Sequence, residues 1–197
     1  MTVNTTLYSI GYATKSIEVF LAQLKKYCIN AIADVRSVPY SKAFFDYHQN
    51  ALKSTLHENG IRYVFLGEEL GPRSKDPAHY DSNQQVRFDL LSQSGLFQEG
   101  INRLKKGLEN NWVIALLCAE KDPADCHRSL LVGRELKINL GINLQHIRHT
   151  GELEQQSDLD IRLTQMHNTQ DDLFCSPQEK IELAYKLQTR LKAYRKE

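Results

Sequence analysis

An α/β fold, with a mostly parallel sheet flanked by helices on both faces, is predicted by three features of the sequence. Short apolar runs alternate with amphipathic stretches between residues 7 and 147, which is the order of parallel strands joined by right-handed helical crossovers. The apolar runs are continuous rather than alternating, as expected for strands that helices cover on both sides. After Arg148 the sequence is polar until a last amphipathic stretch, which predicts a C-terminal helical appendage.

Five strands are expected at the apolar runs, each of which gives way to a glycine or to polar residues. β-branched and large apolar side chains suit the pleated surface of a buried sheet. The strongest strand signal is the fourth run, which ends in a cysteine. The runs are Leu7–Gly11, Ile29–Val35, Ile61–Leu66, Trp112–Cys118 and Ile142–Ile147.

Helices are expected between these runs, where apolar residues recur every three or four positions. The second of them ends at Asn59-Gly60, a common helix stop, and the third stretch is interrupted near Gly95. The expected helices cover residues 17–28, residues 46–58, one or two stretches between Val86 and Leu108, and Pro123 or Cys126 to Lys137.

We expect residues 1–150 to form the α/β domain and residues 151–197 to form a polar loop and a helix that pack on it. Ser176-Pro-Gln-Glu179 combines a capping serine, a proline at the first helical position and a glutamate at the third, which is typical of a helix start. Gly67–Gln85 has no periodicity and contains two glycines and two prolines, which predicts a long loop.

The composition is that of an ordinary globular protein, 41% hydrophobic and 25% charged. A formal net charge of +1, from 25 Lys+Arg against 24 Asp+Glu, excludes a strong global attraction to nucleic acid or membranes. No apolar stretch approaches the roughly 20 residues of a spanning helix, and the first residues lack the pattern of a signal peptide. Four scattered cysteines are too few for a disulfide framework. We therefore expect a cytoplasmic protein with reduced thiols, whose oligomeric state the sequence leaves open.

Polar residues follow three of the predicted strands. They are Gly11-Tyr12, the segment Asp34–Pro39 and the segment Cys118–Arg128. Ligands of open α/β sheets bind beyond the carboxyl ends of the strands. The three segments are therefore expected to converge on one site.

The last of these segments carries two cysteines. Cys118 ends the fourth strand, and Cys126-His127-Arg128 opens the next helix after a loop that contains Glu120. A helix N-terminus favours anions, so the thiol of Cys126 is expected to have a lowered pKa. Arg128 adds a bidentate donor suited to phosphate, sulfate or carboxylate. The alternative is that Cys118 is a small buried hydrophobe.

The other two segments and the long loop add candidate ligand-binding residues. Asp34 and Arg36 end the second strand on the same face, either as a structural ion pair or with Arg36 facing an anionic ligand and Asp34 orienting a base. Gly11 and Tyr12 supply close backbone approach and a stacking ring, or only a turn. Arg73 belongs to a candidate lid over an anionic ligand.

Metal binding is the less favoured interpretation of the same cysteines. Cys118, Cys126 and His127, with Asp122 or Asp125 nearby, are ligand types that suit zinc or iron. The sequence has no Cys-x-x-Cys pair, and neighbouring residues of a helix point in different directions. We therefore predict no cofactor and no metal ligands.

Four segments, Tyr8–Tyr12, Ile32–Pro39, Gly60–Gly67 and Leu116–Arg128, together resemble a bacterial and archaeal family, domain-of-unknown-function family 488. The resemblance covers about residues 7–148, although Leu70-Gly71-Pro-Arg73 departs from the double glycine often found after the leucine. It implies an α/β fold, a cytoplasmic location and no established activity. The positions that match the family's motifs are Gly11, Asp34, Arg36, Pro39, Gly71, Cys118, Glu120, Cys126, His127 and Arg128.

A weaker resemblance concerns architecture alone. A strand, a cysteine, a loop and an Arg-Ser at a helix start are similar to the arrangement in rhodaneses and cysteine phosphatases, and Asp34-Val-Arg36 is similar to a segment of rhodanese domains. The loop from Cys118 to Arg128 is longer than the loops of those enzymes. Such a likeness supports an architecture rather than a reaction.

The combined interpretation is an enzyme that acts on an anionic small molecule or nucleotide, with a cysteine as the reactive thiol. The alternative is a non-catalytic nucleotide- or nucleic-acid-binding module in which the same arginines contact phosphate. Neither interpretation involves a membrane. The candidate catalytic residues are Cys118, Cys126, His127, Glu120 and Asp34, and the candidate ligand-binding residues are Gly11, Tyr12, Arg36, Arg73 and Arg128.

Overall fold

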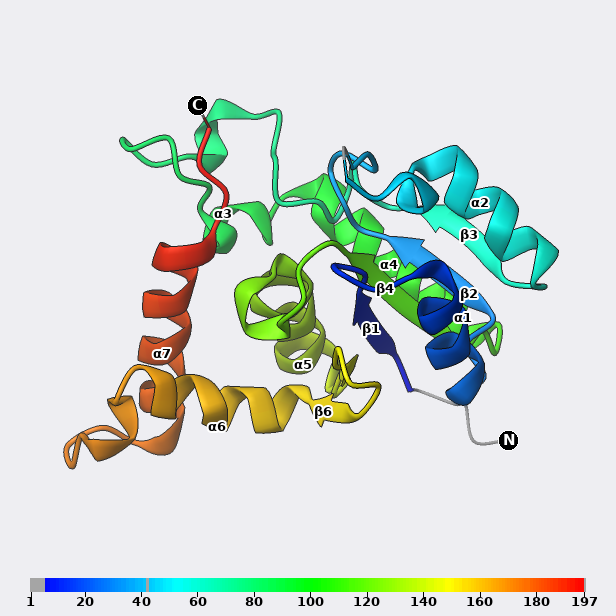
Figure 1. Cartoon of the computed structure of the whole chain (residues 1–197). Coiled ribbons are helices and arrows are strands. Elements are labelled where there is room, and N and C mark those ends of the chain that lie inside the picture. The colour runs from blue at the N-terminus through cyan, green and yellow to red at the C-terminus, as the bar shows by residue number, and fades with distance from the viewer. Residues whose placement is uncertain (1–5, 42, 197) are drawn as a thin grey trace.

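The computed structural model of the chain describes residues 6–41 and 43–196. Residues 1–5, where no signal peptide is expected, lie outside the described part. Within the described residues, six strands form one sheet in the order β3-β2-β4-β1-β5-β6 (Figure 1). They are β1 (Tyr8–Gly11), β2 (Ala31–Asp34), β3 (Arg62–Phe65), β4 (Ile114–Cys118), β5 (Gln145–Ile147) and β6 (Leu153–Gln155). The first five strands are parallel and β6 is antiparallel to β5, so the predicted α/β fold with a mostly parallel sheet is confirmed.

Helices fill the connections between the strands, as the apolar periodicity predicts. Ser16 caps the first of them, because its side chain accepts a hydrogen bond from the N–H of Val19. Ser94 caps the longest helix of the domain in the same way. The helices are α1 (Ile17–Lys26), α2 (Gln49–Glu58), α3 (Phe88–Leu91), α4 (Gly95–Glu109), α5 (Arg134–Leu140), α6 (Gln156–Met166) and α7 (Pro177–Lys192).

Both faces of the sheet are covered, because successive strand residues point to opposite sides. Ile32 of β2 and Leu117 of β4 lie in one core, with buried residues of α1 and α2. Ala33 and Leu116, their neighbours in sequence, lie in a second core with α4 and α5. Every residue of β2 and β4 is buried, which explains the continuous apolar runs.

The connection after β4 is less regular than the single helix predicted there. It contains a 3-10 turn, η3 (Pro123–Asp125), then a π-helical segment, η4 (Arg128–Gly133), and only then α5. π-helical turns occur frequently at functional sites. The irregular backbone therefore lies in the segment that the sequence singles out for chemistry.

The segment after Arg148 packs on the sheet domain more extensively than a loop and one helix. β6 pairs with β5 and extends the sheet, and α6 follows β6 directly. Gln188 of α7 donates a hydrogen bond to the carbonyl of Ala124, over 2.8 Å. None of the described helices is long and apolar enough to cross a membrane.

Candidate functional site

The site lies where β1 and β4 are neighbours in the middle of the sheet. β4 also pairs with β2, and the chain leaves β2 toward β3 on one side and leaves β4 toward β5 on the other, so the connections of β2 and β4 diverge beside this point. Gly11 of β1 lies opposite Cys118 of β4. Such a switch point at the carboxyl edge of an open α/β sheet is the usual place for a ligand.

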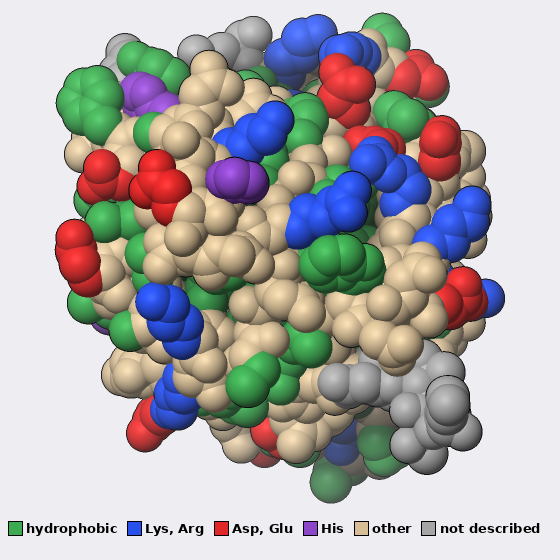
Figure 2. Space-filling model, turned by 90° about the vertical axis from the view of Figure 1, so that its right-hand side faces the viewer, with side chains coloured by type: hydrophobic (Ala, Val, Ile, Leu, Met, Phe, Trp, Pro, Cys, Tyr) green, Lys and Arg blue, Asp and Glu red, His purple; other side chains and the backbone are tan. Residues whose placement is uncertain are grey.

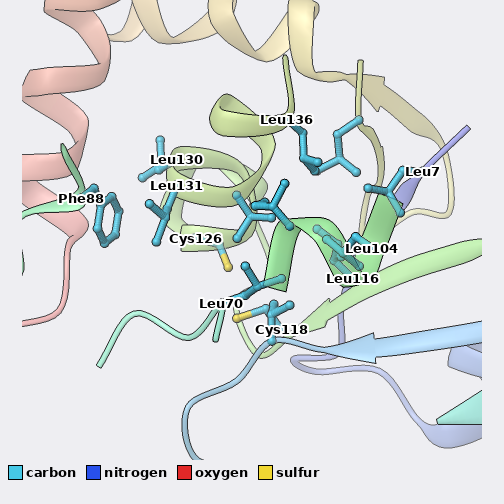
Figure 3. Packing of buried hydrophobic residues seen from close by; sticks show 14 of the residues in the cluster. Leu7, Leu70, Phe88, Leu104, Leu116, Cys118, Cys126, Leu130, Leu131 and Leu136 are labelled. Carbon is cyan, nitrogen blue, oxygen red and sulfur yellow. The ribbon is translucent and has the colours of Figure 1, made fainter. Parts of the chain in front are cut away.

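Two cysteines, a glutamate and a histidine meet beside this point. The Sγ atoms of Cys118 and Cys126 lie 2.7 and 3.0 Å from the same carboxylate oxygen of Glu120. They lie 3.6 and 3.8 Å from Nδ1 of His127. All four potential ligand atoms are within 4.8 Å of one another. In Figure 3 the two cysteine side chains lie at the same end of the core, near Leu70.

The backbone between Cys126 and His127 makes this convergence possible. Cys126 is extended (φ −129°, ψ 141°), whereas His127 already has helical angles (φ −61°, ψ −22°). The chain therefore turns between them, and the two neighbouring side chains face the same space. The expectation that they diverge is wrong, because Cys126 precedes the helical segment instead of belonging to it.

The ring of His127 is oriented by the end of β2. Its Nε2 lies 2.9 Å from the carbonyl oxygen of Val35. Because a carbonyl oxygen can only accept a hydrogen bond, Nε2 carries a hydrogen and is the donor. Nδ1 faces the two sulfur atoms. The residues on either side of Val35 hold this strand end in place: Arg36 donates from Nε and Nη2 to the two carboxylate oxygens of Asp34, over 2.8 and 2.6 Å.

Asp34 and Arg36 thus form the structural ion pair that was one of two interpretations. Arg36 also donates from Nη1 to the carbonyl of Tyr47, over 2.8 Å, and the hydroxyl of Tyr63 donates to Asp34 over 2.7 Å. Asp34 is 0% exposed and Arg36 4%. All the polar groups of the pair are therefore engaged within the protein, and the pair acts on the site through the position of His127.

Glu120 is held from its backbone. Nη1 of Arg128 donates to the carbonyl oxygen of Glu120 over 2.7 Å. A side-chain carbon added at Gly11 would come within 1.9 Å of that oxygen, so the close approach expected of Gly11 is an approach to Glu120. The backbone N–H of Arg128 points to the sulfur of Cys126 at 3.5 Å. Of the four clustered residues Glu120 alone is exposed.

The electrostatics of the cluster differ from the expectation for a helix N-terminus. Burial raises the pKa of Cys126 well above its ordinary value, and the neighbouring sulfur of Cys118 adds to this. The expected lowering of the Cys126 pKa is therefore wrong, since desolvation outweighs the helix end and Arg128. Burial also raises the pKa of Glu120, but His127 and the two thiol hydrogen bonds outweigh it, so this pKa is lowered. Burial lowers the pKa of His127, but Cys126 and Glu120 outweigh it in the opposite direction.

The remaining predicted residues lie outside the cluster. The ring of Tyr12 stacks on that of Tyr47, with centroids 4.3 Å apart, and is 4% exposed. The guanidinium of Arg73 lies over the ring of Tyr194, 4.6 Å from its centroid, and thereby links the long loop to the C-terminal segment. Because its ring stacks on Tyr47 and is buried, Tyr12 belongs to the hydrophobic core beside the site.

Sequence reasoning missed Lys15 and the carbonyl of Val35. Lys15 follows β1 and is only 4% exposed, with Nζ 3.5 Å from the carbonyl of Arg148. Burial, and to a smaller extent the charge on Arg128, lower its pKa to about 8. A lysine three residues beyond Tyr12 gives only a weak signal in the sequence that it is a buried cation near the site. A backbone acceptor such as Val35 leaves no signal in side-chain chemistry.

Comparison with known families places the chain among proteins without an assigned activity. The sequence model of the family described as domain of unknown function DUF488 matches residues 16–134. The chain belongs to this family, as its motifs indicate. The matched part includes β2, β4 and all four clustered residues. Neither a curated protein nor a solved structure matches the chain significantly.

Proposed function

We propose that the protein is an enzyme that acts on a small anionic molecule or nucleotide at the cluster of Cys118, Glu120, Cys126 and His127. The observation that carries this proposal is the convergence of two thiols and an imidazole on one carboxylate, at the switch point of the sheet. Sulfur, imidazole and carboxylate groups that gather in a poorly solvated place, where apolar side chains would pack equally well, are typical of reactive centres. The cluster is the densest gathering of such groups among the described residues.

The substrate approaches from the side of Glu120. Cys118 and Cys126 are 2% and 1% exposed and His127 is 6% exposed, so they form a floor that solvent reaches poorly. Glu120 is exposed and touches both sulfur atoms. Its carboxylate is therefore placed to exchange a proton between the floor and a substrate, as a general base or acid.

The anionic character of the substrate is supported by cations around the site. Lys15 and Arg128 are buried, and among the residues that the structure describes neither makes an ion pair within 4.0 Å. The backbone carbonyls of Arg148 and Lys121 accept from Lys15 and Arg128, and the side chains of Lys121 and Arg148 are exposed cations. A field of uncompensated cations in a poorly solvated place attracts an anion more strongly than it would in water.

The non-catalytic alternative has less support. Arg36 and Arg128 are 4% and 0% exposed, so neither side chain reaches the phosphates of an oligonucleotide. Figure 2 shows basic and acidic side chains interspersed over the face that carries α1, α2 and β3. Nucleic-acid binding depends on a surface of mainly basic residues.

The test is a turnover screen with small phosphate, sulfate and carboxylate esters and with nucleotides. We expect one of these classes to be consumed, and the rate to fall by about 100-fold or more in Glu120→Gln, as for the loss of a general acid or base. Glu68→Gln is the matched control, because Glu68 is also exposed and, within the described part of the chain, its ion pair is with exposed Lys75. Turnover that is equal in Glu120→Gln and Glu68→Gln would contradict the proposal.

A further inference from the structure

We infer that Cys118, Cys126, His127 and Glu120 bind one divalent transition-metal ion of the zinc class, with Glu120 as an exchangeable ligand on the solvent side. The metal site stands on the geometry of these residues. Its use in catalysis rests on the function proposed above. The inference reverses the prediction from sequence that no metal ligands are present.

The distances fit a tetrahedral centre. Bonds of roughly 2.3 Å to sulfur and 2.0–2.1 Å to nitrogen, at tetrahedral angles, separate a sulfur ligand from a nitrogen ligand by about 3.6 Å. Nδ1 of His127 lies 3.6 and 3.8 Å from the two sulfur atoms. The Glu120 oxygen is closer to them, at 2.7 and 3.0 Å, because thiol protons bridge these pairs. An exposed side chain can move outward when a metal ion replaces those protons.

The imidazole is prepared as a ligand. A metal-bound histidine almost always donates its other ring N–H to a carbonyl or carboxylate. Nε2 of His127 makes such a bond to Val35, which leaves the Nδ1 lone pair facing the sulfur atoms. The buried ion pair of Asp34 and Arg36 fixes the strand end that carries this carbonyl. The second layer of a metal site is therefore already built.

The charge of Arg128 is compatible with a bound metal ion. Its side chain is 0% exposed, and its Nε is buried without a hydrogen-bond partner among the described residues. An uncompensated buried cation is costly. Two thiolates, one carboxylate and a neutral imidazole around a dication leave one net negative charge, the same charge that the Glu120 carboxylate gives the metal-free cluster, so Arg128 offsets it in both states. Its bond to the Glu120 carbonyl, at 2.7 Å, places it beside the cluster.

The ligand arrangement is of the catalytic kind. Structural zinc sites are closed by four buried ligands, whereas catalytic sites have three protein ligands and an open fourth position. Here two sulfur atoms and one nitrogen are buried, and the fourth ligand is an exposed carboxylate. Glu120 can leave the metal for a water molecule or a substrate. A metal there would act as a Lewis acid or lower the pKa of a bound water.

The experiment is metal titration of the full chain, stripped with a chelator and kept reduced. Cobalt(II) is the probe, since it occupies zinc sites and reports its ligands by absorption. We expect one ion per chain, thiolate-to-cobalt charge-transfer absorption and the intense visible bands of a tetrahedral centre, all lost on addition of zinc. Weak binding with an octahedral spectrum, or no binding, would overturn the inference. So would an air-formed disulfide between Cys118 and Cys126 whose reduced form takes up no metal.

Variants identify the ligands. Cys118→Ser and Cys126→Ser should each lower the affinity by more than ~100-fold, because even outer-layer changes cost about 10–100-fold. Cys175→Ser is the matched control, since this free cysteine lies outside the cluster, and it should bind as the unaltered protein does. Affinity that is unchanged in either cluster variant would refute the site. Circular dichroism verifies the fold of each variant.

Glu120→Gln keeps the test decisive if the cysteine variants do not fold, because it alters an exposed side chain. It should retain cobalt with a changed band pattern, and an unchanged spectrum would exclude Glu120 as a ligand. The same titration separates the metal site from the enzymatic activity. Metal uptake without turnover of any ester or nucleotide leaves the metal site and removes the enzyme. Turnover that persists in metal-free protein leaves the enzyme and removes the catalytic metal.

Discussion

His127 and His146 are both buried at the carboxyl half of the same sheet, at 6% and 0% exposure, yet their surroundings oppose each other. Around His127 stand two thiols and a carboxylate, which raise its pKa against the effect of burial. Among the described residues, the hydrogen-bond partners of His146 are neutral: its Nδ1 lies 2.7 Å from the hydroxyl of Ser9, and its Nε2 lies 2.9 Å from Oε1 of Gln156. Burial and the charge on Arg128 lower its pKa to about 3.

The difference shows that burial alone does not decide what a histidine does. His146 belongs to a chain of hydrogen bonds in which Gln156 donates to the hydroxyl of Tyr185 and this hydroxyl donates to Asp160. Every polar group there has a partner, so the chain joins the sheet to α6 and α7. His127 has one nitrogen engaged and the other facing groups that can lose protons. The first arrangement stabilises the fold, and the second offers a ligand atom.

The largest effect is expected from breaking the support of His127. Arg36→Met leaves Asp34 buried with Tyr63 as its remaining side-chain donor, and removing one partner of a buried ion pair costs about 3–5 kcal/mol of stability. Urea unfolding measures this loss. The control is Arg87→Met, which removes an exposed pair with Asp89 and should change stability by less than about 1 kcal/mol. Equal losses in both variants would show that Asp34 does not depend on Arg36.

A smaller loss is expected from the other histidine. Gln156→Leu removes the acceptor of His146 and the donor to Tyr185, which leaves buried polar groups without partners at a cost of about 1–3 kcal/mol. Because none of the four clustered residues takes part in this network, cobalt affinity should stay unchanged while the urea midpoint falls. A variant that unfolds as easily but also loses cobalt would mean that the two regions are coupled.

A pH dependence that belongs to His146 is the smallest effect when it is counted over one pH unit. Its pKa of about 3 in the folded protein lies below the ordinary 6.5, so the unfolded chain binds the extra proton as pH falls through this window. Stability contributed by neutral His146 is therefore complete above pH 6.5 and declines toward pH 3, by at most about 1.4 kcal/mol per pH unit. Arg128, Arg162 and Asp122 are the charged groups that act on it.

The measurement is urea unfolding of the unaltered protein and of His146→Gln at pH 7, 6 and 5. We expect the variant to be less stable at pH 7 and its stability to fall less steeply below pH 6.5. The comparison between the two proteins cancels the carboxylates that titrate in both. Parallel pH profiles would show that His146 keeps an ordinary pKa.

Much of the fold was predictable, and the errors have local causes. Residues 112–118 and 29–35 are apolar enough to indicate buried strands, and both are central in the sheet. β6 was missed because Leu153–Gln155 is three residues long and at the edge, where one face meets solvent and no apolar run is required. The helix after β4 was predicted as regular, and its π-helical part, Arg128–Gly133, depends on contacts that no local pattern encodes.

One part of the candidate site was likewise predictable from the sequence, and another part was not. The alternation of strands and helices predicts that Gly11 and Cys118 lie at one edge of the sheet, whereas their direct pairing depends on the strand order of the folded protein. That Cys126 and His127 face one space was not predictable, because it depends on backbone angles that change between them. The pKa of Cys126 was predicted in the wrong direction, since a helix end is visible in sequence and the depth of burial is not.

The sequence by itself determined the α/β class, the order of its elements and the segment that carries the chemistry, because hydrophobic periodicity and motif spacing are local properties of the chain. Only the tertiary structure decided the partners. It paired Arg36 with Asp34, buried Arg128 with no hydrogen-bond partner for its Nε among the described residues, and brought Cys118, Glu120 and His127 within reach of Cys126. Partners and desolvation set the charge and reactivity of a side chain, and both depend on segments distant in sequence.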